Sequence, residues 1–297
     1  MLISRGEKVF HFVNAILLLI LSFSILYPFL HILAVSLNDG NDAMSRGVVL
    51  WPRKFSLAAY ELVFKEPLLF HSAYVSVFRT VVGTLINLIG TAVIAYVLAN
   101  RQLLFRRTTI FLFLFTMYFN GGLIPEFLLI RSLGLYDQMA VYLLPGLVAA
   151  MPIMIMRQFF EDLPQALLES ARIDGASEFR TLMRIVIPMS TPVMATMALL
   201  YAVGHWTSWY DTYFFTRNDG KLATLQGILV KILMESEAQR MASDYSSLME
   251  SMRGESKPTS EVIRMATITI TTLPVLCVYP FLQKYFVSGM TLGAVKE

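Results

Sequence analysis

Long apolar runs, separated by shorter polar segments, set the pattern of the whole chain. Six of these runs are long enough to cross about 30 Å of hydrocarbon, where only helices and closed barrels satisfy all their backbone groups. They cover residues 12–34, 74–99, 108–131, 139–159, 186–206 and 264–287. The pattern predicts an all-α, polytopic membrane protein with six transmembrane helices in a single domain over residues 1–297.

Glycine and proline interrupt several of the apolar runs. Asn120-Gly121-Gly122 and Pro125 break the third run, and such a break is tolerated at membrane depth only where protein or a water cavity satisfies the backbone. Four further prolines are expected to kink or break their helices: Pro145, Pro152, Pro274 and Pro280. These interruptions favour a bundle that moves or lines a cavity over an inert anchor.

Composition agrees with a membrane protein. The chain is 56% hydrophobic and 15% charged, whereas about a quarter of the residues are charged in a typical soluble domain. The net charge of +3 is too small to indicate a nucleic-acid partner. The single cysteine, Cys277, excludes an internal disulfide and a cysteine-based metal cluster.

The first apolar run has two interpretations. Arg5 and Lys8 precede it and Ala34-Val35-Ser36 loosely resembles a cleavage site, as in a secretory signal peptide. However, the run from His11 to Leu33 is longer than the apolar core of about 7–15 residues in such signals. Its length favours an uncleaved first span.

Positive charges in the short loops predict the orientation in the membrane, because cytoplasmic loops are enriched in Lys and Arg. The short loop 132–138 holds neither, although Arg131 lies at its edge. If the N-terminus lies in the cytoplasm, the cytoplasmic segments contain Arg5, Lys8, Arg101, Arg106, Arg107, Lys284 and Lys296. Both termini and the loop 160–185 are then cytoplasmic, and the segments 35–73 and 207–263 are extracellular.

A block of six charged side chains follows the fourth run, in the stretch ESARIDGASEFRTLMRIVIP over residues 169–188. Burying six charges in lipid would cost about 15–20 kcal/mol, at about 3 kcal/mol for each charge. The block must therefore lie in water or against another protein.

Two short helices joined by a glycine turn are predicted around this block. Asp162 is expected to cap the first helix, with Pro164 in its first turn and Gln165 at the reciprocal capping-box position. That helix should end at Asp174-Gly175, where glycine suits a left-handed C-terminal cap. Ser177 is expected to cap the second helix.

The first of these helices has the properties of a docking element. Ser170 and Ala171 are small, so a partner's surface can approach them closely. Glu169, Arg172 and Asp174 surround them with charges that can pair across an interface. From these properties alone, an ordinary charged loop between spans remains an equal alternative.

The block resembles the cytoplasmic signature loop of ABC-importer permeases. That signature is a Glu-Ala-Ala triplet, three residues, a glycine, nine residues and then Ile-x-Leu-Pro. Here the matching positions hold Glu169, Ser170, Ala171, Gly175, Ile185, Ile187 and Pro188. Ser170 stands for alanine and Ile187 for leucine, and both changes keep the size class of the side chain.

Three further stretches narrow the resemblance. Residues 119–125 (FNGGLIP), the turn 133–135 (LGL) and the ending 289–296 (GMTLGAVK) are similar to the MalG-like, carbohydrate-uptake branch of these permeases. Within it, the LplB/YtcP-type polysaccharide permeases of Gram-positive bacteria are more similar still. The outer segment 217–262 is longer than in maltose-type proteins and is typical of this closer group.

The resemblance implies a type I ABC importer permease fold and a half-transporter. Its partners would be a second, related permease (usually a different chain), two cytoplasmic ATPases that each receive one signature loop, and an extracellular lipoprotein that delivers the oligosaccharide. The implied coupling residues are Glu169, Ser170, Ala171, Arg172, Asp174, Gly175, Ile185 and Pro188. The sequence has no GxxxxGK[ST] phosphate loop, so we expect no enzyme activity and no cofactor in this chain, with ATP used by the partners.

Candidates for a sugar pathway lie near the end of the fifth run, since sugar sites favour aromatic faces beside polar groups. Tyr201, His205 and Trp209 recur every four residues and share one helix face, with Trp206 beside them. For Trp206 and Trp209, an aromatic belt at the lipid interface is an equal alternative. Asn87 is a further candidate.

Asn87 belongs to a stripe of small and slightly polar residues in the second run. Gly83, Gly90 and Thr91 share its helix face. Close helix packing is the favoured interpretation of this stripe, and pathway lining is the alternative.

Other functions are less compatible with the sequence. The outer segment 217–262 is expected either to contact the binding protein or to be a solvated insertion. An importer for another solute, such as amino acids, would share the signature loop but not the carbohydrate-type stretches. A secondary transporter would need charged relay residues in its spans, and Glu126 is the main candidate, near the end of an interrupted run.

Overall fold

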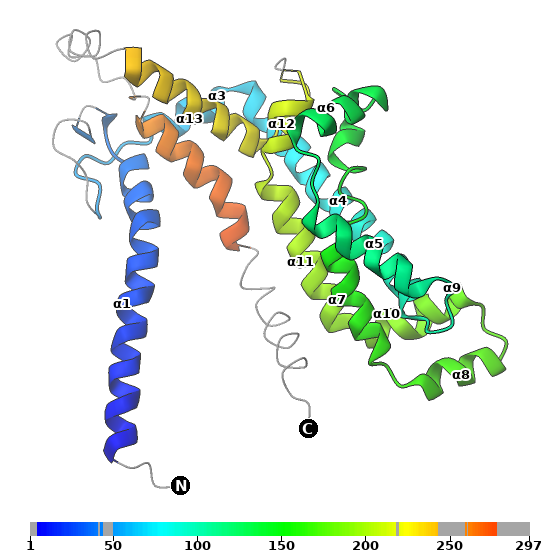
Figure 1. Ribbon diagram of the computed structural model, residues 1–297. Coiled ribbons are helices and arrows are strands. Elements are labelled where there is room, and N and C mark those ends of the chain that lie inside the picture. The colour runs from blue at the N-terminus through cyan, green and yellow to red at the C-terminus, as the bar shows by residue number, and fades with distance from the viewer. Residues whose placement is uncertain are drawn as a thin grey trace. The chain divides into compact units, whose positions relative to one another are not determined.

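The computed structural model describes residues 5–40, 42–43, 50–217, 220–242, 259 and 261–277 (Figure 1). In these ranges the regular structure is helical, and the strand-like pairing is limited to one isolated bridge between Asn38 and Phe55. The predicted all-α class is therefore confirmed for the described part of the chain. The chain divides into two compact units, Met1–Leu69 with Leu229–Pro274 and Phe70–Ile228 with Val275–Glu297.

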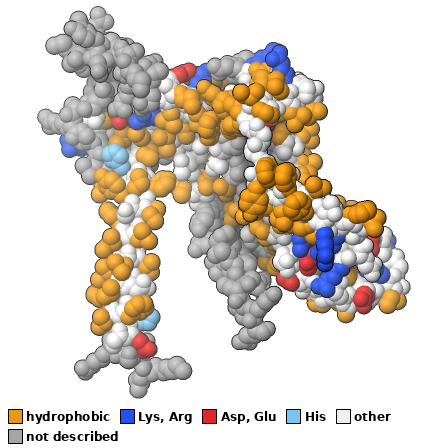
Figure 2. All heavy atoms as spheres, in the orientation of Figure 1, with side chains coloured by type: hydrophobic (Ala, Val, Ile, Leu, Met, Phe, Trp, Pro, Cys, Tyr) orange, Lys and Arg blue, Asp and Glu red, His pale blue; other side chains and the backbone are white. Residues whose placement is uncertain are grey.

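The first unit is dominated by helix α1 (Arg5–Ser36), which contains Pro28. Its hydrophobic side chains are exposed along most of its length, as Figure 2 shows. A helix that is apolar on all sides requires an apolar surrounding such as lipid or another helix. The unit also contains α3 (Ala58–Lys65) and residues 261–274 of a helix that is described over 261–277. Its small core consists of Ala34, Val35, Ala59, Val262 and Ala266.

Helix α4 (Pro67–Ala99) is the second long apolar helix, and most of it belongs to the second unit. After it, α5 (Arg106–Tyr118) and α6 (Leu123–Ser132) meet at an angle of 117°. Gly122 precedes α6 with φ +82°, and its N–H donates to Asn120 Oδ1 at 2.7 Å. The predicted break in the third run is thus confirmed, and glycine is required there because other residues rarely adopt this φ.

The fourth run differs from the continuous helix expected over 139–159. A short 3₁₀ helix, η1 (Met139–Tyr142), is followed by irregular chain, and α7 (Ala150–Glu161) begins eleven residues later than expected. Pro145 lies in the irregular part, where its ring and missing N–H are compatible with a break. Pro152 causes no kink, because it lies in the first turn of α7, where proline is tolerated.

The fifth run forms α11 (Thr191–Thr207), which is bent by 87° from the preceding segment Glu178–Met189. That segment comprises α9 (Glu178–Thr181), the π-helical η2 (Leu182–Val186) and α10 (Ile187–Met189). The helix therefore begins at Thr191 rather than at 186. Ser190 leaves helical geometry with ψ 18°, and Pro192 starts the new helix where its missing N–H costs nothing.

Two described helices, Gly6–Ser36 and Pro67–Ala99, are long and apolar enough to cross a membrane by themselves. The number rises to four if each of the two bent pairs is counted as one span. The structure therefore supports a multi-pass membrane protein, while the count of six stays a prediction. Pro280 and the end of the run 264–287 lie outside the described residues.

Helices α4, α7 and α11 enclose the main core of the second unit, together with η2. Ala92 and Ala95 of α4 face Met156, Phe160, Leu182, Val186, Val193, Met197 and Tyr201. The small side chains allow close helix approach, and two glycines extend this surface. A Cβ on Gly83 would lie 2.6 Å from the His205 ring, and one on Gly90 would lie 3.1 Å from Leu147. The packing interpretation of the small-residue stripe is therefore confirmed.

Two further helices follow α11. They are α12 (Tyr210–Phe215) and α13 (Leu225–Ala242), and α13 matches the helical periodicity of residues 222–241. The side chain of Phe215 packs in a second cluster with Val75, Ile130, Val141 and Tyr142. This cluster joins the first half of α4 to α6, η1 and α12.

Candidate functional site

Helix α8 (Gln165–Ile173) carries the signature residues and ends in the predicted glycine turn. Gly175 has φ +76°. Its N–H donates to the carbonyl of Arg172 at 3.1 Å, and the N–H of Ala176 donates to the carbonyl of Ala171 at 2.9 Å. This paired pattern is the glycine C-cap that the sequence predicts.

The start of α8 differs from the prediction. Asp162 forms the C-terminal cap of α7 and accepts a hydrogen bond from Gln158, whereas the N-cap of α8 is Pro164, with no side-chain bond. The predicted capping role of Asp162 is wrong because α7 continues to Glu161 and uses Asp162 as its own end. The second cap is confirmed, since Ser177 Oγ accepts from the N–H of Arg180 at 3.3 Å.

The surface of α8 is larger and more apolar than the predicted small patch. Ala171 is 7% exposed and packs inside this chain, so its size serves internal packing and not the approach of a partner. Ser170 is exposed, as expected. Ile173 at the end of α8 is 86% exposed and Phe179 in the neighbouring α9 is 67% exposed, and neither has the cover that apolar side chains of this size usually find. Exposed apolar groups flanked by charge are typical of an interaction surface.

The remaining signature residues lie along the same path. Glu169 and Arg172 are exposed on α8, and Asp174 forms its C-cap. Ile185 is half-buried in η2, and Pro188 lies in α10. The path therefore runs from α8, through the glycine turn, to the bend that precedes α11. Figure 2 shows Lys, Arg, Asp and Glu side chains gathered at this end of the second unit.

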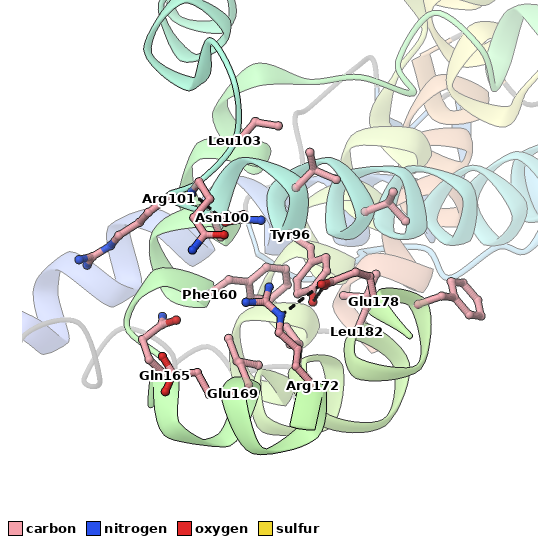
Figure 3. Close-up of a pocket in the computed structure, with 17 residues that line it drawn as sticks. Tyr96, Asn100, Arg101, Leu103, Phe160, Gln165, Glu169, Arg172, Glu178 and Leu182 are labelled. Carbon is pink, nitrogen blue, oxygen red and sulfur yellow. Dashed lines mark hydrogen bonds and ion pairs between the residues drawn. The ribbon is translucent and has the colours of Figure 1, made fainter. Parts of the chain in front are cut away.

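A cavity of about 530 Å³ lies between α8 and the C-terminal end of α4 (Figure 3). Tyr96 and Leu103 line it from the side of α4, and Phe160 lines it from α7. Gln165 and Glu169 of α8 lie on the opposite wall. The cavity leaves α8 in loose contact with α4 along one side.

The carboxylate of Glu178 bridges three helices beside this cavity. Glu178 Oε1 accepts from Arg172 Nε of α8 at 3.2 Å, and Oε2 accepts from the Tyr96 hydroxyl of α4 at 2.5 Å (Figure 3). The Arg172 and Glu178 side chains are 43% and 60% exposed. Water therefore competes with this ion pair, which contributes little to stability.

A second ionic cluster ties α5 to α7. Glu161 Oε1 accepts from Arg157 Nε at 2.6 Å and also from Arg106 Nη2, while Arg106 Nε donates to the carbonyl of Leu98. Burial alone would raise the pKa of Glu161, but its bonds to Arg157 and Arg106 outweigh burial and lower the pKa. The carboxylate is thus held ionised close to the point where α8 begins.

Three of the predicted pathway residues meet between α4 and α11. The Tyr201 and Thr91 hydroxyls are 2.5 Å apart, and Asn87 Nδ2 lies 3.3 Å from His205 Nε2. Each side chain therefore has a polar partner on the neighbouring helix, which makes a polar seam inside an otherwise apolar interface. Trp206 and Trp209 are half-buried near the end of α11.

Trp209 lies in a local aromatic group and not on the seam. Its ring contacts Tyr210 and Tyr213 edge-on, with centroid distances of 6.3 and 6.1 Å. The predicted shared face therefore brings Tyr201 and His205 to α4, while Trp209 lies beyond the end of α11.

Arg79 is the residue that the sequence reasoning missed. It lies in α4, is 2% exposed, and forms an ion pair with Asp211 of α12. Its Nη1 also donates to the Ser208 carbonyl at 3.3 Å, and its guanidinium lies 4.5 Å from the centroid of the Tyr142 ring. The available signal was a single arginine inside a predicted span, because such charges are costly and need a partner.

Among the described residues, no group of three or more His, Cys, Asp or Glu side chains is arranged to hold a metal ion. Besides the α8 end with its Glu178 bridge, the buried charge forms a second site, the Arg79 cluster, which we define as Arg79, Tyr142, Ser208 and Asp211. Within the Arg79 cluster, Ser208 Oγ also donates to Asp211 Oδ2 at 3.2 Å.

Together, the apolar helices, the broken spans and the exposed α8 define a membrane-embedded transport component. The family described as "Binding-protein-dependent transport system inner membrane component" matches residues 107–292, which is more than half of the chain. The chain belongs to this family. The predicted resemblance is thereby confirmed, and the chain is a transporter permease subunit.

Similar proteins cover nearly the whole chain. The polygalacturonan/rhamnogalacturonan transport system permease protein YtcP of Bacillus subtilis is 39% identical over 269 residues, covering 91% of this chain and 92% of its own. Protein LplC of the same organism is 38% identical over 293 residues, covering 99% and 97%. The crystal structure of a bacterial ABC transporter that imports the acidic polysaccharide alginate contains a chain with a TM-score of 0.84 and 32% identity, covering 95% of this chain and 98% of that one.

Proposed function

We propose that this permease takes up oligosaccharides or polysaccharide fragments as part of an ABC importer. The observation that carries the substrate class is similarity over nearly the full length to proteins named for polygalacturonan, rhamnogalacturonan and alginate transport. An importer for a non-sugar solute such as amino acids is the alternative, and those names disfavour it. A secondary transporter is disfavoured because the chain belongs to a family of binding-protein-dependent transport components.

The proposed assembly has the partners that such an importer requires. Two ATPase subunits would bind and hydrolyse ATP on the cytoplasmic side, and a second, related permease would complete the pathway. An extracellular solute-binding lipoprotein would deliver the sugar, with the outer segment 217–262 as a candidate contact. In this proposal the chain itself binds no cofactor, and both termini lie in the cytoplasm.

The complete permease is proposed to have six transmembrane helices. Helix α8 is the proposed ATPase-docking element. Its exposed signature residues Glu169, Ser170, Arg172, Asp174 and Gly175 would contact the ATPase. The buried Ala171 and the half-buried Ile185 would hold the element on the permease, and Pro188 would maintain the bend toward α11. The large exposed side chains of Ile173 and Phe179 support this proposal because a partner would cover them.

The polar seam is the proposed inner part of the sugar pathway. Tyr201, His205 and Asn87 bond across the α4–α11 interface in this structure and would face the sugar when the helices separate. Their polarity supports the proposal, since polar groups inside a membrane are costly and usually serve a function. Trp206 and Trp209 would contribute aromatic faces near the end of α11.

The docking proposal is tested by replacing Gly175 with tryptophan. The turn requires φ +76°, and no heavy atom lies within 4 Å of an added Cβ, so the bulk would project into open space. The complex should therefore lose its ATPase subunits on purification while the permease remains in the membrane. The matched control is Gly134→Trp, which has φ +69° and equally open surroundings but lies away from α8.

The same preparations identify the sugar. Wild-type complex in proteoliposomes would be offered oligosaccharides of galacturonan, rhamnogalacturonan, alginate, arabinan and starch, each with ATP inside. Uptake of one or more of them, lost with Gly175→Trp and kept with Gly134→Trp, is the expected result. Normal ATPase recovery and uptake with Gly175→Trp would refute the docking role.

A further inference from the structure

Helix α8 has few connections to the membrane helices of its own chain. Ala171 is its one buried residue, and the cavity of about 530 Å³ separates it from the end of α4. Within the described residues, the side-chain hydrogen bond that ties α8 to another element is the one from Arg172 to Glu178. Force applied to α8 therefore reaches the permease through its chain connections to α7 and the glycine turn, through Ala171 and Leu168, and through this bond.

Glu178 links α8 to two further helices, α4 and α11. Its second carboxylate oxygen accepts from the Tyr96 hydroxyl, three residues before the end of α4. Its backbone begins α9, which continues through η2 and α10 to the bend before α11. The same carboxylate is thus linked to α4 through a side chain and to α11 through the main chain, and these two helices share the polar seam.

We propose that Glu178, with Tyr96 and Arg172, is the positioning bridge that transmits movement of the docked α8 to α4 and α11. This inference rests on the proposed function of α8. The bridge is a coupling device rather than a stabilising one, because its ion pair is largely exposed to water and therefore weak. Weak contacts can break and form again during each transport cycle, and the adjacent cavity gives α8 room to move.

Two conservative variants test the bridge in the full assembly. Tyr96→Phe removes only the hydroxyl that donates to Glu178, and Glu178→Gln keeps the shape of the side chain but removes its charge. The control is Asp162→Asn, which removes another exposed carboxylate that does not line the cavity and accepts its bond from Gln158. Each variant would be purified with the ATPase subunits in lipid nanodiscs and reconstituted for uptake of the panel oligosaccharide that the wild type imports.

The readout is the number of ATP molecules hydrolysed per sugar imported. Both bridge variants should keep the ATPase subunits and the wild-type melting temperature, but raise this ratio by roughly 2- to 30-fold, the range expected for a residue that modulates coupling. Asp162→Asn should leave it unchanged. A merely structural bond would alter the melting temperature and not the ratio.

The proposal is overturned if both variants assemble with a wild-type ratio, or if Glu178→Gln loses the ATPase subunits while Tyr96→Phe couples normally. In the second case Glu178 would act in docking. Failure of the proposed function would give a different result, because the ATPase subunits would then still co-purify with the Gly175→Trp permease.

Discussion

Two of the ion pairs that join helices of this permease have opposite environments. Arg172 and Glu178 are 43% and 60% exposed beside α8, whereas Arg79 and Asp211 are 3% and 25% exposed between α4 and α12. An exposed pair exchanges its partners for water at small cost. A buried arginine cannot do so, because an unpaired charge inside the protein costs several kcal/mol.

The difference indicates which contacts can change during transport. The Arg79 cluster fixes α4 to η1 and α12 through an ion pair, a carbonyl bond and an aromatic face. The Glu178 bridge fixes α8 to α4 by bonds that water can replace. We therefore expect the contacts of the first region to persist, and those of the second to break and form again during each transport cycle.

The largest effect should follow from breaking the buried pair. Asp211→Ala leaves Arg79 charged and buried, so it should reduce the free energy of unfolding by about 3–5 kcal/mol. Glu178→Gln should change it by less than about 1 kcal/mol, because the exposed pair contributes little. Thermal unfolding of the purified permease in detergent, followed by intrinsic fluorescence, compares the two.

A double variant serves as the control for the buried pair. Arg79→Met with Asp211→Ala removes both charges, and should recover most of the stability lost in Asp211→Ala, since replacing a buried pair by apolar groups is often nearly neutral. Equal unfolding temperatures for Asp211→Ala and Glu178→Gln would contradict the contrast between the regions.

A smaller, pH-dependent effect is expected at Glu161, whose side chain is 14% exposed. Its pKa in the folded protein is lowered because Arg157 and Arg106 outweigh burial. A depressed folded pKa gives stability that is present above the unfolded value of about 4.5 and is lost as the pH falls through the folded pKa. The wild type should therefore be more stable than Glu161→Gln at pH 6–7.

The stability difference between wild type and Glu161→Gln should shrink steadily below about pH 4.5. Unfolding temperatures measured from pH 3.5 to 7 in steps of half a unit would show it. A difference that stays constant over this range would mean that the Glu161 carboxylate is not the source of the stabilisation.

The turn and the second cap around α8 were predicted well because their signals are local. A glycine required at φ +76° and a serine cap at Ser177 depend on a few neighbouring residues, and both are confirmed. Asp162 was misassigned because two helix ends compete for it, and the outcome depends on how far α7 extends. The apolar pattern predicts that a helix exists in this run, but it does not predict the residue at which α7 ends.

Contacts between distant segments could not be derived in the same way. Arg79 and Asp211 are 132 residues apart, and their pairing follows from how α4 packs against α12. Ala171 was assigned to a partner-facing patch because size alone does not tell which face of α8 is buried. Arg79 itself is visible in the sequence as a charge inside an apolar run, and such a charge requires an acidic partner.

The central claim is that α8 lies in the cytoplasm and is available to an ATPase. Ile173→Cys places a thiol at a position that is 86% exposed, and Cys277→Ser removes the one native cysteine. A membrane-impermeant maleimide, applied to cells that lack the ATPase subunits, should fail to label this variant until the membrane is permeabilised. Labelling in intact cells would place α8 outside and contradict the account.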